Sequence, residues 1–204
     1  MPTSVVPWLV ALRTGTVPVL APANAAPVLV PAHAIGAPLD LRLAVAVVAG
    51  LLATLAMTGV MSLLSEGYVP PYVAASALFD ETPGKVSRRQ ADAAHYAAGT
   101  LAGILFELLV VALETVRDAT VATALVVGNV LTLSDLLATL LVVGFLYAFF
   151  AYVVFPRRGG RLYDDPERRE RVRFHWLISA TVYGVALLAA VVLLYAGLGL
   201  SALS

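Results

Sequence analysis

The sequence predicts an all-α integral membrane protein, a bundle of four transmembrane helices. Of its 204 residues, 60% are hydrophobic and only 13% are charged, whereas soluble domains contain about 45–50% apolar and about 25% charged residues. The mean hydropathy is +0.90. Four mostly apolar runs reach about 20 residues, the length a helix needs to cross a bilayer. These observations exclude a soluble globular protein.

The first 40 residues differ from the rest of the chain. Residues 1–38 contain seven of the twelve prolines, and Arg13 is the only charged residue among them. A secretory signal has a basic start and an unbroken apolar core, and this segment has neither. We therefore expect residues 1–40 to form a flexible tail, or to reflect a misassigned start, and residues 41–204 to form the membrane domain.

The four spans are expected at about residues 43–64, 93–113, 134–155 and 175–200. Capping signals precede three of them: the capping box Ser87 to Gln90, the segment Thr132 to Asp135, and the N-cap Asp165 followed by a proline. Pro156 is expected to end the third span. Residues 121–131 are apolar but too short to span, so they predict an interfacial or re-entrant segment.

Lys and Arg are distributed unevenly about this four-span arrangement. The loops after the first and third spans carry ten of them, and the other side carries three: Arg13, Arg42 and Arg117. By the positive-inside rule, the ten-residue side faces the cytoplasm and both termini are extracytoplasmic. Arg42, immediately before the first span, is the local exception.

Small and polar residues recur at intervals of four on the first two spans. They are Gly50, Thr54 and Thr58 on the first span, and His95, Gly99, Gly103 and Glu107 on the second. The second set contains a GxxxG motif, which lets two helix backbones approach closely. We therefore expect these two helices to pack antiparallel along the two stripes.

Glu107 is the main candidate for chemistry, because a carboxylate inside a membrane helix costs roughly 2.5–3.5 kcal/mol. Its depth places it level with Gly50 and Thr54 and within reach of Tyr195. It is either a proton-carrying or ion-binding group, or a protonated residue that hydrogen-bonds across helices. The second interpretation is favoured, because no other buried charge accompanies it.

No cofactor or metal is expected. The chain has no cysteine, which excludes thiolate metal sites and iron–sulfur clusters. His95 and His175 lie at the ends of neighbouring spans, where two histidines can ligate a haem, but their position at the headgroup level is ordinary for histidine. The sequence gives no positive reason for a haem.

The charged segments outside the spans indicate a lipid environment. Acidic residues offset most of the charge from Arg157 to Arg173, so we expect attraction to anionic lipid headgroups and no nucleic-acid binding. At the opposite face, a solvated rim is expected, formed by Glu114, Arg117, Asp118 and Asp135.

Three segments carry a resemblance: 49–58 (AGLLATLAMT), 67–72 (GYVPPY) and 145–155. Together they resemble small multi-pass membrane proteins of prokaryotes, especially archaea, over about residues 43–200. That group has no established activity, so the resemblance implies no functional residue.

The functional expectation follows from what the chain carries. The sequence shows neither a nucleophile–base pair nor a cluster of metal ligands, so we expect a protein without catalytic activity rather than an enzyme. The leading hypothesis is a non-enzymatic accessory subunit or structural protein, associating with other membrane subunits or with itself. The alternative is a small proton-coupled transporter using Glu107, although the two halves show no internal repeat.

Overall fold

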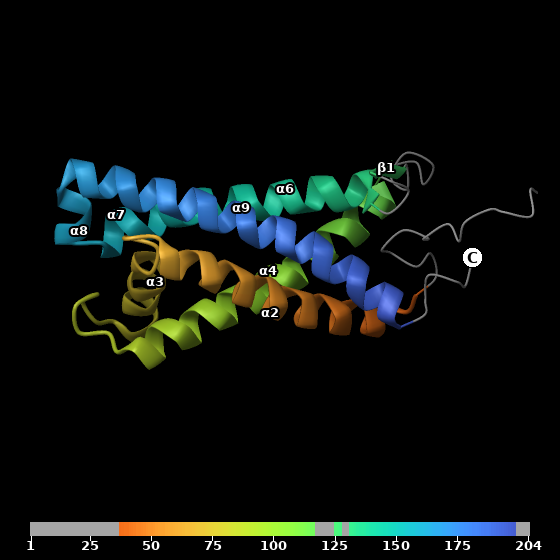
Figure 1. Cartoon of the computed structure of the whole chain (residues 1–204), viewed down its shortest axis with the longest axis horizontal. Helices are drawn as coiled ribbons and strands as arrows, with labels where there is room; N and C mark the ends of the chain where they lie inside the picture. The colour runs from red at the N-terminus through yellow and green to blue at the C-terminus, as the bar shows by residue number, and fades with distance from the viewer. Residues whose placement is uncertain (1–36, 117–124, 128–130, 199–204) are drawn as a thin grey trace, which may run out of the picture.

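Four long helices make up most of the part of the chain that the structure describes. The computed structural model describes residues 37–116, 125–127 and 131–198, so nearly all of the tail expected at 1–40 lies outside the described residues. The helices are α2 (Leu39–Leu63), α4 (Arg88–Val116), a continuous rod of α6 (Leu133–Ala148), η1 (Phe149–Val154) and α7 (Phe155–Arg158), and α9 (Pro166–Gly197). Each is long and apolar enough to cross a membrane, which confirms the predicted multi-pass bundle (Figure 1).

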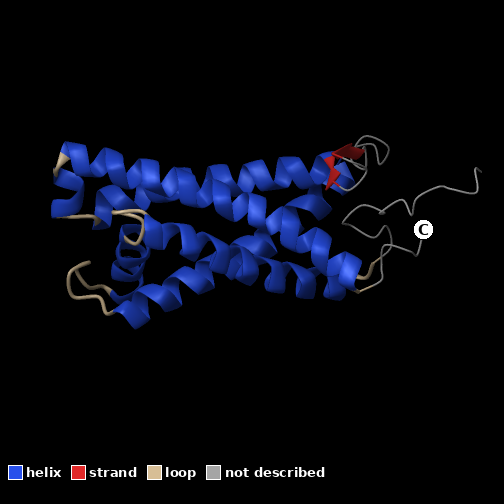
Figure 2. Cartoon of the chain, in the orientation of Figure 1, coloured by secondary structure: helices blue, strands red, loops and turns tan. Residues whose placement is uncertain are grey.

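The connections gather at the two ends of the bundle (Figures 1 and 2). One end, here called the arginine-rich end, holds α3 (Val69–Phe79), α7 and α8 (Arg161–Asp164). At the other, the hairpin end, β1 (Leu125–Val127) pairs antiparallel with β2 (Leu131–Thr132). This strand pair includes the described part of the segment predicted to be interfacial or re-entrant; residues 121–124 and 128–130 of that segment lie outside the described residues.

Side-chain caps fix where three helices begin. At the start of α4, the Ser87 backbone N–H donates to Gln90 over 2.8 Å, and the Gln90 N–H donates back to the Ser87 hydroxyl over 3.3 Å. Thr132 and Asp135 form a complete capping box at α6. Asp165 accepts from two backbone N–H groups at the start of α9, immediately before a proline. All three predicted caps are confirmed.

Pro156 does not end the third span, contrary to expectation. The helix passes through the π-helical turn η1 and continues as α7 to Arg158. In the i→i+5 pattern of a π-helix, residue 156 would donate to the carbonyl of Ala151, and proline has no N–H to donate. Arg173 of α9 donates to that carbonyl instead, over 3.2 Å. A neighbouring helix thus satisfies the backbone group that the proline leaves without a donor.

The core lies where α2 packs antiparallel between α4 and α9. Its largest fully buried side chains include Phe106, Tyr183 and Leu187. Large apolar side chains on the outside of the bundle stay exposed, for example Leu55, Leu101, Leu140 and Leu193. An apolar exterior on all four helices suits contact with lipid.

Candidate functional site: a buried charged cluster between four helices

Glycines bring the backbones of α2 and α4 into contact. A Cβ atom added to Gly50 would lie 2.9 Å from the carbonyl oxygen of Gly99 and 3.1 Å from the Cα of Gly103. A Cβ atom on Gly103 would meet the backbone of Ala46 and Gly50, and one on Gly99 would meet Thr54. The two small-residue stripes therefore lie against each other, as GxxxG packing requires.

This register places Glu107 nearer the hairpin end than its sequence depth suggested. Gly99 lies opposite Thr54, and Gly103 lies opposite Gly50 and Ala46. One further turn of α4 brings Glu107 to the first turns of α2. Thr54 is consequently not its partner: the Thr54 hydroxyl donates to the Gly50 carbonyl of its own helix over 2.7 Å.

The partner of Glu107 is Arg42. The Nε of Arg42 lies 2.5 Å from Oε1 of Glu107, and its Nη1 lies 3.1 Å from Oε2 of Glu114, seven residues further along α4. Glu107 is only 1% exposed. The premise that Glu107 has no charged neighbour is therefore wrong, and the arginine that seemed misplaced in the charge distribution is a partner of two carboxylates.

Side chains from the other two spans complete this arrangement, which we call the charged cluster: Arg42, Glu107, Glu114, Asp135 and Tyr195. Tyr195 of α9 is buried and lies close enough to the four charged residues to interact with them electrostatically. Asp135 of α6 is fully buried and accepts from the Thr132 N–H over 2.8 Å. The expectation that Asp135 lies on a solvated rim is wrong, because its carboxylate caps a helix inside the fold. Arg117 and Asp118 lie outside the described residues.

The two histidines have separate partners. His95 is buried, and its Nε2 lies 2.9 Å from the hydroxyl of Thr58 on α2. His175 accepts a 3.3 Å hydrogen bond from the backbone N–H of Glu66 through Nδ1. Thr58 and His95 extend the α2–α4 contact toward the arginine-rich end. Within the described residues, no group of three or more His, Asp or Glu side chains is arranged to hold a metal ion.

Tyr183 of α9 adds a third helix to the glycine contact. Its buried hydroxyl donates to the carbonyl of Gly99 over 2.7 Å. Near the arginine-rich end, Tyr68 donates to Asp92 over 3.0 Å, and the guanidinium of Arg88 lies 3.6 Å from the centre of the Tyr68 ring. Burial, together with the bond to Asp92, raises the pKa of Tyr68.

Most arginines between Arg157 and Arg173 are paired with acids. Ion pairs join Arg158 to Asp80, Arg168 to Glu66, Arg171 to Glu167, and both Arg169 and Arg173 to Glu170. Arg157 and Arg161 form no ion pair with the described residues. The segment therefore has less free positive charge than its arginine content suggests.

In comparisons with known proteins, no family model, no curated protein and no solved structure matches the chain.

Proposed function

We propose that this chain is a non-enzymatic membrane protein, an accessory or structural subunit whose bundle is stabilised by the charged cluster. The observation that carries this proposal is the 2.5 Å contact between Arg42 and Glu107. Glu107, an acidic side chain within the apolar part of α4, forms an ion pair with Arg42 of the same chain.

The energetics favour a structural role for this pair. A charged side chain in a membrane helix costs roughly 2.5–3.5 kcal/mol when it is alone, and an opposite charge in hydrogen-bonding contact offsets much of that cost. Removing one member of a buried pair leaves the other uncompensated, which typically costs about 3–5 kcal/mol. The pair joins the start of α2 to the middle of α4, so it fixes the same register that the glycines set.

The proposed partners are other membrane subunits or a second copy of this chain. The four spans of the described residues expose many large apolar side chains, and this apolar exterior offers a surface for association within the bilayer. We further propose that both termini are extracytoplasmic and that the arginine-rich end faces the cytoplasmic, anionic leaflet.

Gentle-detergent purification of the full chain from its native membrane tests the subunit proposal. Chemical cross-linking before solubilisation, followed by native mass spectrometry, should show a stoichiometric second chain or a homo-oligomer. A chain that is monomeric after cross-linking in the native membrane would contradict the proposal.

A small proton-coupled carrier remains the second candidate, and one observation favours it. A single guanidinium contacts both Glu107 and Glu114, so two carboxylates, the groups that often form proton relays in membrane transporters, lie at one basic side chain. Reconstituted in liposomes under a pH gradient, a carrier would show proton flux that Glu107→Gln abolishes and Glu66→Gln leaves intact. Equal, background-level flux in all three proteins would exclude this candidate.

A further inference from the structure

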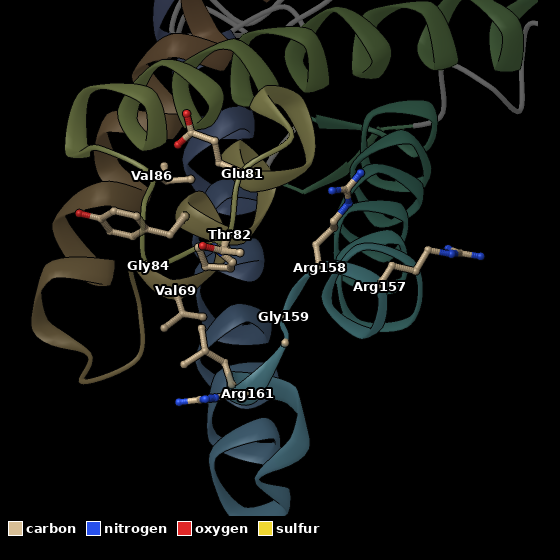
Figure 3. Close-up of a pocket in the computed structure, with 13 residues that line it drawn as sticks. Val69, Glu81, Thr82, Gly84, Val86, Arg157, Arg158, Gly159 and Arg161 are labelled. Atoms are coloured by element: carbon tan, nitrogen blue, oxygen red, sulfur yellow. The ribbon is translucent and has the colours of Figure 1, made fainter.

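A pocket opens at the arginine-rich end, away from the charged cluster. It lies between α3, the loop of residues 81–86, and the turn that connects α7 to α8, and its volume is about 1070 Å³. Figure 3 shows Val69, Thr82 and Gly84 on one side and Arg158 on the other. This volume slightly exceeds the roughly 300–1,000 Å³ that is typical of pockets for small organic ligands.

The pocket combines an apolar wall with cationic side chains. Val69, Tyr72 and Val86 supply the apolar wall, and Arg158 and Arg161 supply guanidinium groups. Arg157 also lines the pocket, but its guanidinium points away from the loop in Figure 3. Guanidinium groups bind phosphate through two parallel N–H donors, so this lining suits an amphiphile that carries a phosphate.

The charge balance leaves the two arginines available to a ligand. Arg161 forms no ion pair with any described residue. Arg158 contacts Asp80 at 2.8 Å, but that carboxylate is 88% exposed, and a solvated ion pair of this kind is weak. Glu81 is the one acid that lines the pocket, and its carboxylate points away from Arg161 in Figure 3.

The turn between the two arginines requires both of its glycines. A Cβ atom on Gly159 would lie 2.6 Å from the carbonyl oxygen of Phe155, so no larger residue fits there without a shift. Gly160 has a φ of 52°, in the left-handed region that favours glycine, and its Cβ would meet open space. The sequence RRGGR thus builds a tight turn that holds Arg158 and Arg161 at its two ends.

We propose that this pocket binds the headgroup of one anionic phospholipid, attracted by the charges of Arg158 and Arg161, whose guanidinium groups point to opposite sides in Figure 3, with the glycerol region against Val69 and Tyr72. A lipid is favoured over a soluble phosphate by the position of α3, which forms one wall. Two apolar side chains at the end of α3, Leu78 and Phe79, are 70% and 45% exposed, as expected of a helix that lies at a membrane interface. The site is independent of the proposed subunit role, and it differs from diffuse attraction because it needs two particular arginines.

Native mass spectrometry of the purified full chain tests this site. With phosphatidylglycerol added in mild detergent, one lipid should bind in preference to phosphatidylcholine. Each of Arg158→Gln and Arg161→Gln should weaken that binding about five-fold, the effect expected of one basic residue near an anionic headgroup. Thr82→Trp should also weaken it by filling the pocket without changing charge, because the Thr82 side chain is exposed on the pocket wall.

Arg171→Gln is the matched control. It removes the same charge from the same arginine-rich segment, but Arg171 lies on α9, pairs with Glu167 and does not line the pocket. Circular dichroism melting checks that every variant is folded. If Arg171→Gln weakens binding as much as Arg161→Gln, attraction is diffuse and the site is refuted. If inorganic phosphate at millimolar concentration binds equally well and displaces the lipid, the ligand is a soluble phosphate and the lipid assignment is wrong.

Discussion

Arg42 contacts two carboxylates at the hairpin end, so a single guanidinium lies between Glu107 and Glu114 in the interior of the bundle. The arginine comes from the first turns of α2, while Glu107 and Glu114 lie on one face of α4, seven residues apart. Because Tyr195 and Asp135 approach from α9 and α6, each of the four spans contributes a polar side chain at this level.

The sequence predicts which face of each helix packs better than it predicts which side chains meet across that face. Small residues at intervals of four identify the packing face of each helix, because backbone contact requires them at that spacing. The identity of the side chain opposite Glu107 depends on where each helix begins. Depth measured from the apolar runs alone, about 43–64 and 93–113, misses the extra turns at 39–42 and 114–116, and so misses Arg42 as the partner.

The first prediction concerns Gly103. Gly103→Ala should destabilise the bundle by about 1–3 kcal/mol, because its Cβ meets backbone atoms of α2 that cannot move without shifting the helix. Gly59→Ala on α2 is the control, since a Cβ there has nothing within 4 Å. Thermal unfolding in detergent micelles measures both. Equal stability of the two variants would show that α2 and α4 are not in backbone contact.

The third span shows how one element depends on another. Pro156 removes a backbone donor, the π-helical turn precedes it, and Arg173 from α9 supplies the replacement hydrogen bond. The sequence indicates the proline but not its consequence, because nothing local identifies a donor 17 positions away. The sequence also does not indicate α3, for a different reason: this helix is apolar, but its 11 residues are too few to cross a bilayer.

The second prediction tests this dependence with a double-mutant cycle. Arg173→Gln should cost about 1–3 kcal/mol by leaving the buried Ala151 carbonyl without its donor. In a Pro156→Ala background the same change should cost less, because residue 156 then has an N–H of its own. Unfolding free energies of the four proteins give the coupling. Identical costs in both backgrounds would mean that Arg173 does not compensate for the proline.

On the scale of the whole molecule, both described ends of the chain lie at the hairpin end, and the basic loops lie at the other (Figure 1). The number of spans and their apolar exterior could be predicted, because length and hydropathy determine which helices can cross a bilayer. The function could not be predicted in the same way. Insertion into a bilayer determines which residues lie on the outer surface of the helices, whereas a specific function depends on a few polar residues in the interior.

The third prediction concerns orientation. Because the chain has no cysteine, a single introduced cysteine labels one position only. In intact cells, a membrane-impermeant maleimide should label Asp40→Cys, at the hairpin end, and should label Gly84→Cys only after the cells are opened. Both positions are exposed, and a side chain at Gly84 meets nothing within 4 Å. Labelling in the reverse pattern would place the arginine-rich end outside.

If Arg42 and Glu107 stabilise the bundle as a pair, their contributions to the unfolding free energy are coupled, and a double-mutant cycle measures that coupling energy. Arg42→Ala and Glu107→Ala should each lower the unfolding free energy by about 3 kcal/mol, and the double variant should lose clearly less than the sum of the two. Unfolding of the full chain in mixed micelles gives these values. A coupling energy of at least about 1 kcal/mol is expected. Additive losses, or single variants as stable as the parent chain, would show that the two side chains do not act as a pair.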